Sequence, residues 1–230
     1  MATLINALFF VLGIICFFVG LFCCAAGGFC LEWADFLKAE WGKQKVFTFF
    51  VVGAVLTGEG KFFSNGLDLE WMTEAGEEST RLVVERLQAL YIRLMSFPVP
   101  VIAAVNGHAF AGGAMLALAC DERVMREDRG FFCLPEVDIN IPFVPGMSKL
   151  IQSKLTPAAA HKAMIGGYRF GGPEAVEWGI ADEATAEDQV LPTAIERAKA
   201  LSGKNRIVVA AIKNVMYHDA IEALARFESF

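Results

Sequence analysis

Residues 62–69 read Phe62-Phe63-Ser64-Asn65-Gly66-Leu67-Asp68-Leu69, and they come shortly after a run rich in Val and Phe. That run, from Val46 to Leu56, predicts one buried strand that ends in a turn at residues 57–60. Gly66 lets the following loop turn sharply, so that the loop can aim a backbone N–H group across a cleft. Alone, the stretch predicts a loop after a strand, and its meaning depends on the segments around it.

The segments that follow this loop predict alternating helices and strands. Residues 77–97 place apolar side chains on one stripe and stop before a proline pair, which predicts an amphipathic helix. Residues 101–105 predict a short apolar strand, and residues 106–108 a turn. The Ala- and Leu-rich residues up to Cys120 then predict a buried helix that opens at Gly112-Gly113.

The second half of the chain repeats this pattern less regularly. Residues 123–125 and 131–133 predict strands, and a helix is expected from about Gly146 to Leu155. Beyond residue 155 we expect helices only, with starts at Thr156-Pro157 and Gly172-Pro173, since proline suits the first turn of a helix. The sequence therefore predicts an α/β fold that becomes helical at its end.

Composition excludes some classes of partner. The chain has 230 residues and a net charge of -6, and it shows no clustered Lys and Arg, which argues against nucleic acid. The six cysteines lack metal-ligand spacing, so we expect no metal site and no disulfide framework. The length fits one catalytic domain with a short appendage.

The first 31 residues contain no charged side chain. The apolar run from Leu4 to Leu31 exceeds the roughly 20 residues that a helix needs to cross a bilayer, so residues 1–31 predict a membrane anchor. A secretory signal fits less well, because no Lys or Arg precedes the run. A buried core segment is the other alternative.

Two further stretches could carry chemistry. Gly112-Gly113 open the predicted buried helix, whose first N–H groups have no acceptor within the helix and lie at its positive end, where an anion can bind. Close packing against a strand would explain the same glycines. Glu136 stands among apolar residues, and its burial would raise the pKa of the carboxyl group toward the range of a general base. A solvated glutamate at a strand end also fits.

Together and in this order, the loop at 62–69, Gly112-Gly113 and the segment around Glu136 resemble the crotonase superfamily of enoyl-CoA hydratases and isomerases. The loop looks most like that of the plant peroxisomal Δ3,Δ2-enoyl-CoA isomerases. The similarity extends from about Val51 to Gly179. It implies a crotonase-type ββα spiral over residues 46–230, with an α/β core at 46–155 and helices for oligomerisation at 156–230.

The resemblance also implies roles for single residues. It makes the N–H groups of Leu67 and Gly112 an oxyanion hole and makes Glu136 the catalytic acid and base. It places a coenzyme A channel along Ser64, Asn65, Gly66, Leu67 and Asp68. The chemistry agrees, because two preorganised donors stabilise the charge that develops on a thioester oxygen, each by roughly 3 kcal/mol.

One position departs from the hydratase pattern. Hydratases of this superfamily hold a water between two glutamates, and the first of these aligns with Met115, which can neither orient nor deprotonate water. Glu136 alone is enough for isomerisation, since it can take a proton from C2 of a 3-enoyl-CoA and return one at C4. Simple core packing would also explain Met115.

The resemblance thus implies an isomerase of fatty-acid β-oxidation that acts on an acyl-CoA, needs no cofactor beyond the coenzyme A of its substrate, and forms a homotrimer. The alternatives are a hydratase or another crotonase-type acyl-CoA enzyme, and an inactive membrane-anchored interaction protein. The resemblance implies a peroxisomal location, although Glu228-Ser229-Phe230 is not a Ser-Lys-Leu type of address. Membrane contact through residues 4–31 is the alternative location.

Overall fold

The computed structural model of the chain describes residues 47–50 and 53–227. Within this part the strands form two sheets, one of five strands in the order β1-β2-β4-β6-β8 and one of three in the order β3-β5-β7. The larger sheet contains β1 (Phe47–Phe50), β2 (Gly53–Thr57), β4 (Val101–Val105), β6 (Glu122–Arg126) and β8 (Glu183–Thr185). The smaller sheet contains β3 (Phe62–Ser64), β5 (His108–Phe110) and β7 (Phe132–Cys133).

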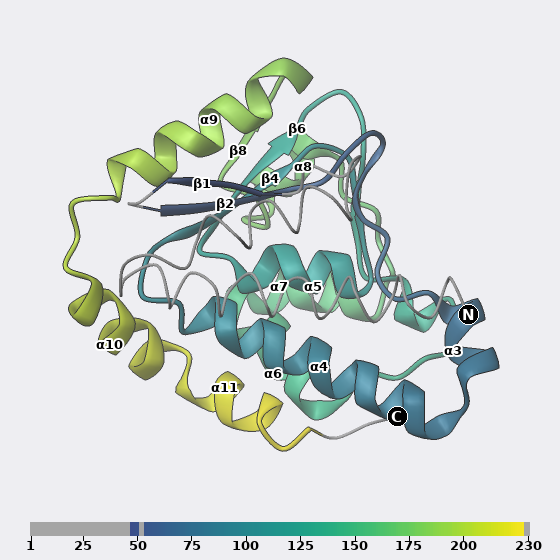
Figure 1. The fold of residues 1–230 in the computed structure, drawn as a ribbon. Coiled ribbons are helices and arrows are strands. Elements are labelled where there is room, and N and C mark those ends of the chain that lie inside the picture. The colour runs from purple at the N-terminus through teal and green to yellow at the C-terminus, as the bar shows by residue number, and fades with distance from the viewer. Residues whose placement is uncertain (1–46, 51–52, 228–230) are drawn as a thin grey trace, which may run out of the picture.

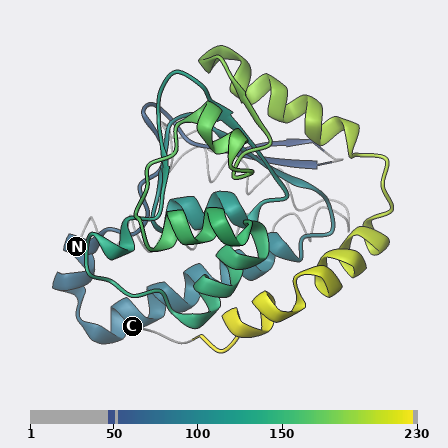
Figure 2. The same cartoon turned by 180° about the vertical axis from the view of Figure 1, so that it is seen from behind.

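Helices surround both sheets and gather toward the C-terminal end of the chain (Figures 1 and 2). They are α3 (Leu69–Ala75), α4 (Glu77–Met95), α5 (Gly112–Ala119), α6 (Pro145–Lys154), α7 (Pro157–Met164), α8 (Gly172–Glu177), α9 (Glu187–Ala200), α10 (Arg206–Met216) and α11 (His218–Leu224). A single 3-10 turn, η1 (Pro135–Val137), follows β7.

Successive strands alternate between the two sheets. From β2 to β8, each strand of the larger sheet is followed by one of the smaller sheet, and helices then lead back to the larger sheet. All neighbouring strands are parallel except β1 and β2. Parallel neighbours need long crossovers, which the helices supply. The repeating strand-strand-helix order is the ββα spiral expected from the sequence.

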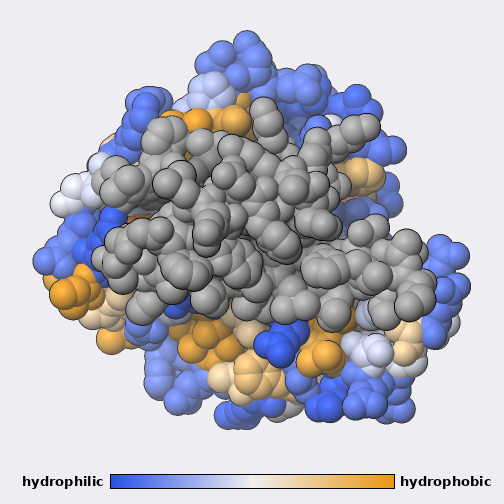
Figure 3. Space-filling view, in the orientation of Figure 1, coloured by the Kyte–Doolittle hydropathy of each residue, from blue (hydrophilic) through white to orange (hydrophobic). Residues whose placement is uncertain are grey.

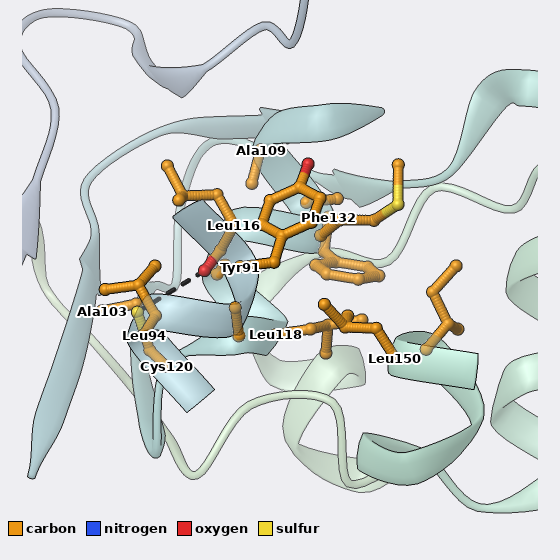
Figure 4. Packing of buried hydrophobic residues seen from close by; sticks show 14 of the residues in the cluster. Tyr91, Leu94, Ala103, Ala109, Leu116, Leu118, Cys120, Phe132 and Leu150 are labelled. Atoms are coloured by element: carbon orange, nitrogen blue, oxygen red, sulfur yellow. Dashed lines mark hydrogen bonds between the residues drawn. The ribbon is translucent and has the colours of Figure 1, made fainter. Parts of the chain in front are cut away.

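Strands β2, β4 and β6 carry buried side chains on both faces of the larger sheet, since successive side chains of a strand point to opposite faces. One face carries Val55, Ile102 and Val124 against α9, which covers this side of the sheet (Figure 1). The other face belongs to the main core, in which Leu94, Leu118 and further side chains from α4, α5 and α6 pack together (Figure 4). The core thus fixes α5 directly beside the sheet.

Four expectations about elements were wrong. The run at 46–56 forms two antiparallel strands, with Phe50 paired to Gly53, instead of one strand. The loop at 61–69 contains strand β3, and the turn expected at His108 is the start of β5, because these short segments pair with each other in the smaller sheet. The region after residue 155 also contains a strand, β8, which pairs with β6.

The C-terminal helices are attached through a buried ion pair. Lys213 of α10 is 6% exposed, and its Nζ donates to Asp121 at 2.8 Å and to the carbonyl of Leu94 at 3.1 Å. Helix α11 then packs against α6 and α4. This ties α10 to the core through one face and leaves its other face exposed.

The described residues include no helix that is long and apolar enough to cross a bilayer. The anchor predicted within residues 1–31 lies outside the described part of the chain.

Candidate active site

A cavity of about 750 Å³ opens between the smaller sheet, α4, α5 and the segment after β7. Four short stretches line it: residues 65–69, 110–112, 135–136 and 139–143. Single side chains complete the lining, namely Met72, Leu87, Met115 and Met147. Most of these groups are apolar, and the size is in the usual range for a site that holds a small ligand.

The loop after β3 forms one wall of this cavity. Gly66 has a φ angle of +83°, and its N–H donates to the Ser64 hydroxyl at 3.4 Å. Asp68 caps α3, since its carboxylate accepts a hydrogen bond from the N–H of Trp71 at 3.0 Å. Leu67 therefore lies between two fixed positions of the backbone. The cavity is lined by Asn65, Gly66, Leu67 and Asp68. Ser64 is absent from the lining, and its hydroxyl contacts the loop by accepting the hydrogen bond from Gly66.

The start of α5 forms the adjoining part of the cavity wall. Ala111, which precedes the helix, has φ 49° and ψ -123°, an unusual conformation for a residue with a Cβ atom. Its N–H donates to the carbonyl of Cys133 at 3.0 Å, and its own carbonyl accepts from the N–H of Met115 at 3.1 Å. This sharp turn ends β5 and makes Gly112 the first residue of the helix.

The two walls meet in direct backbone contact. A Cβ atom on Gly66 would lie 3.2 Å from the nitrogen of Gly112, and one on Gly113 would clash with the carbonyl oxygen of Ser64 at 2.3 Å. Glycine is required because only a residue without a side chain allows this approach. The Leu67 and Gly112 segments thus lie side by side on the cavity wall, as the oxyanion-hole hypothesis requires.

Glu136 enters the cavity from η1 and is 5% exposed. Its Oε2 atom is buried without a hydrogen-bond partner among the described residues. Burial raises the pKa of this carboxyl group to about 7, since a charged carboxylate is poorly solvated in such a place. Near neutral pH, Glu136 can therefore exchange a proton in either direction.

Met115 lines the same cavity and is 3% exposed. It lies three residues after Gly112 in α5, so it follows the helix N-terminus by about one turn. Among the described acids near the end of α5, Asp121 pairs with Lys213 and Glu122 with Arg197. Neither lines the cavity, and in the described part of the chain Glu136 is its single buried carboxylate.

Several groups around the cavity could not be identified from the sequence. The apolar wall formed by Met72, Leu87 and residues 139–143 comes from segments that show no motif. The hydroxyl of Tyr91 donates to the carbonyl of Gly112. In the sequence, Tyr91 lies on the same apolar stripe as Leu87, and this position indicates only that the side chain packs in the core. Only the fold reveals what these side chains face.

The part of the chain that the structure describes contains no group of three or more His, Cys, Asp and Glu side chains that could hold a metal ion. The titratable group inside the cavity is Glu136, and Asp68 lies at its exposed edge.

Comparisons with known proteins agree with this geometry. The family described as Enoyl-CoA hydratase/isomerase matches residues 50–229. Enoyl-CoA delta isomerase 2, a peroxisomal protein of Arabidopsis thaliana, is 38% identical over 173 residues, which are 71% of this chain and 72% of that protein.

Solved structures extend the comparison. A probable enoyl-CoA hydratase from Mycobacterium tuberculosis superposes with a TM-score of 0.73 at 31% identity, covering 76% of this chain and 74% of that one. The human mitochondrial delta3-delta2-enoyl-CoA isomerase superposes with a TM-score of 0.68 at 26% identity, covering 76% of this chain and 72% of that one. Proteins named as isomerases and as hydratases are therefore both similar to this chain.

Proposed function

Because this chain belongs to the enoyl-CoA hydratase/isomerase family, we propose that it shifts the double bond of a 3-enoyl-CoA to give the trans-2-enoyl-CoA. One observation carries this choice of reaction: among the described residues, Glu136 is the single buried carboxylate of the cavity, and Met115 lines the cavity where the resemblance aligns a glutamate in hydratases. Isomerisation needs one proton-transfer group, whereas hydration also needs a held and activated water.

The reaction begins when ionised Glu136 removes a proton from C2 of the substrate. The electrons of the broken C–H bond form a C1–C2 double bond, and the thioester oxygen receives the negative charge of a dienolate. The N–H groups of Leu67 and Gly112 stabilise this charge, each by roughly 3 kcal/mol. Protonated Glu136 then delivers its proton to C4, the C2–C3 double bond forms, and the thioester carbonyl is restored.

The pKa of Glu136, raised to about 7 by burial, suits both steps. A carboxyl group with an ordinary pKa would be a weaker base toward C2 and would hold its proton too briefly for the return step. The apolar walls around it keep bulk water away from the dienolate, and this also supports proton return over addition of water.

The coenzyme A part of the substrate would enter along the loop after β3. Asn65, Gly66, Leu67 and Asp68 line the cavity there, and the hydroxyl of Ser64 supports the turn from behind. In this proposal the acyl chain occupies the apolar end of the cavity, near Met72 and Met147. The reaction as written uses no cofactor beyond coenzyme A itself.

Product analysis tests the proposal. Purified full-length chain is incubated with trans-3-hexenoyl-CoA, and the thioesters are separated by chromatography. We expect trans-2-hexenoyl-CoA as the product. A 3-hydroxyacyl-CoA would show that the chain hydrates the isomerised product, free coenzyme A would favour a hydrolase, and unchanged substrate would exclude the isomerase. With trans-2-hexenoyl-CoA as a second substrate, a hydratase forms the 3-hydroxyacyl-CoA and the inactive interaction protein forms no product.

We also propose that three copies assemble through the C-terminal helices. The outer face of α10 exposes Ile207 by 81%, Val215 by 80% and Met216 by 67%. Orange side chains gather at the left edge of the molecule, where Figure 1 places α10 (Figure 3). So large an apolar face on a helix is typical of a surface that is covered by another subunit.

For location we propose the peroxisome, because the Arabidopsis relatives include isomerases named as peroxisomal. The test is fluorescence microscopy of a fusion in which the fluorescent protein is attached at neither end of the chain. We expect its signal to coincide with that of a peroxisomal marker. An anchor within residues 1–31 would instead keep the full chain in the membrane pellet after alkaline carbonate extraction and release a chain that begins at Glu32.

A further inference from the structure

A buried tyrosine lies directly behind the first residue of α5. Tyr91 is 0% exposed, and its hydroxyl donates to the carbonyl oxygen of Gly112 at 2.8 Å. The ring comes from α4 and lies within the core beside α5 (Figure 4). A Cβ atom on Gly112 would stand only 3.3 Å from this hydroxyl oxygen, so the missing side chain leaves room for the phenol.

The hydrogen bond acts on the peptide that follows the Gly112 N–H. This N–H belongs to the Ala111–Gly112 peptide, whereas the Gly112 carbonyl belongs to the Gly112–Gly113 peptide, and the two peptides share the Cα atom of Gly112. Because glycine itself allows many φ and ψ values, contacts on both peptides restrict the backbone at Gly112. The preceding residue, Ala111, is held at φ 49°, a strained conformation that persists only where surrounding contacts maintain it. The Ala111 carbonyl that accepts from Met115 belongs to the same peptide as the Gly112 N–H and holds it from one side, and the Tyr91 hydroxyl holds the Gly112–Gly113 peptide on the other side of the Gly112 Cα atom.

Resting on the proposed role of Gly112 as a donor to the thioester oxygen, we infer that Tyr91 is a positioning residue that holds the Gly112 backbone in the orientation needed to stabilise the dienolate. Tyr91 does not line the cavity, so it acts through Gly112 and does not touch the substrate. A phenylalanine would keep the ring packing and lose only the bond to the carbonyl.

The Tyr91 hydroxyl also stays protonated and therefore remains a hydrogen-bond donor. Burial and the nearby Glu136 carboxylate raise the pKa of Tyr91 well above the usual value of a phenol. Tyr91 therefore keeps its proton throughout the range in which Glu136 titrates. Its removal should lower the height of the pH–rate profile and leave the midpoint in place.

A spectroscopic probe tests the inference without turnover. In 4-(dimethylamino)cinnamoyl-CoA the carbonyl is conjugated with an aryl amine, and the absorption band moves to longer wavelength when the thioester oxygen accepts strong hydrogen bonds. We expect wild-type protein to shift the band, and Tyr91→Phe to lose at least half of that shift. Turnover should fall roughly tenfold with KM changed less than twofold, because the donor is misaligned and not removed.

Tyr217→Phe is the matched control. Tyr217 is 9% exposed at the junction of α10 and α11, and it does not line the cavity. This variant should keep both the band shift and the turnover of wild type. A wild-type shift and wild-type turnover in Tyr91→Phe would overturn the inference, even if its melting temperature drops. No shift in wild type itself would remove the proposed oxyanion hole, and the inference with it.

If Tyr91→Phe does not fold, 3-fluorotyrosine at position 91 keeps the hydroxyl and serves as a probe. Its fluorine resonance should move when the same thioester binds. The thioester oxygen accepts from the Gly112 N–H, and the resulting change at Gly112 reaches Tyr91 through the hydrogen bond to the Gly112 carbonyl. The resonance of 3-fluorotyrosine at position 217 should stay in place. An unchanged resonance at position 91 in protein that does shift the absorption band would contradict the inference.

Discussion

The Cα atom of Gly66 faces the backbone nitrogen of Gly112, so that a Cβ atom on Gly66 would stand 3.2 Å from that nitrogen. The two residues are far apart in the chain, and their contact places the turn after β3 against the first residue of α5. The same Cβ atom would stand 3.1 Å from the Phe110 carbonyl oxygen and from the Ala111 Cβ atom, so it would press on the turn that leads into α5. The position of the Gly112 N–H therefore depends on the absence of a side chain at Gly66.

Gly66→Ala should therefore lower isomerase turnover by at least about a hundredfold, the scale for losing one oxyanion donor. The measurement is kcat with trans-3-hexenoyl-CoA. Part of the effect could come from strain, because Gly66 has φ +83°. Gly76→Ala is the matched control, since Gly76 has φ +82° with no atom within 4 Å of its added Cβ. It should lose similar stability and keep turnover; equal loss of turnover in both variants would argue for strain alone.

Glu136→Gln should keep the fold and lower turnover by at least about a hundredfold, because the amide cannot carry the proton from C2 to C4. Affinity for a saturated acyl-CoA, measured by calorimetry, should be nearly unchanged, since the side chain still fills the same position in the cavity wall. Glu70→Gln is a suitable control and should keep wild-type turnover, as this carboxylate is exposed and lies outside the cavity lining. Near-normal turnover in Glu136→Gln would remove this residue from the mechanism.

The pH dependence should follow the ionisation of Glu136. Proton removal needs the carboxylate, and burial raises the pKa of this group to about 7. Below that value the group is protonated in the free enzyme, so kcat/KM should fall about tenfold for each further pH unit; above it, kcat/KM should reach a plateau. Rates between pH 5 and 9 provide the measurement. A plateau that continues down to pH 5 would show that the carboxyl group keeps an ordinary pKa.

Wild-type protein supplied with trans-2-hexenoyl-CoA should form almost no 3-hydroxyacyl-CoA. Adding water at C3 requires a second group to orient and deprotonate it, and Met115 has no such capacity. The acids Asp121 and Glu122 are engaged in ion pairs away from the cavity. Chromatography of the 3-hydroxy product measures the rate. Rapid hydration with Met115 intact would overturn the isomerase assignment and leave the fold and the oxyanion hole unaffected.

Val215→Asp should convert the proposed trimer to monomers without unfolding them. Val215 is 80% exposed in the single chain, so the new carboxylate stays in water in the monomer but would be buried between subunits in the trimer. Light scattering after size exclusion gives the mass. The neighbouring change Asn214→Asp adds the same charge at an exposed position beside the apolar face and should leave the trimer intact. An unchanged mass for Val215→Asp would place the interface elsewhere.

The sequence alone predicted the elements whose pattern is local. The apolar stripe of residues 77–97 gave α4 nearly to its ends, and residues 101–105 form β4 as expected. The helix that opens at Gly112 is also present, since glycine and the following Ala-Leu run act over a few residues. Short segments were misjudged. Phe62–Ser64 and Glu183–Thr185 are strands only because distant strands offer hydrogen bonds to them.

The order of the motifs, through the resemblance to a known family, was enough to propose Glu136, Leu67 and Gly112 as site residues. It did not predict which side chains surround them. The pKa of Glu136 is raised because the side chain is buried, and the cavity that it enters is also lined by residues 139–143 and by side chains of α3 and α4. The contact of Gly66 with Gly112 and the bond from Tyr91 join segments that no local pattern connects. Periodicity reports which face of an element is buried, whereas the partner of each buried atom is decided by packing across the whole chain.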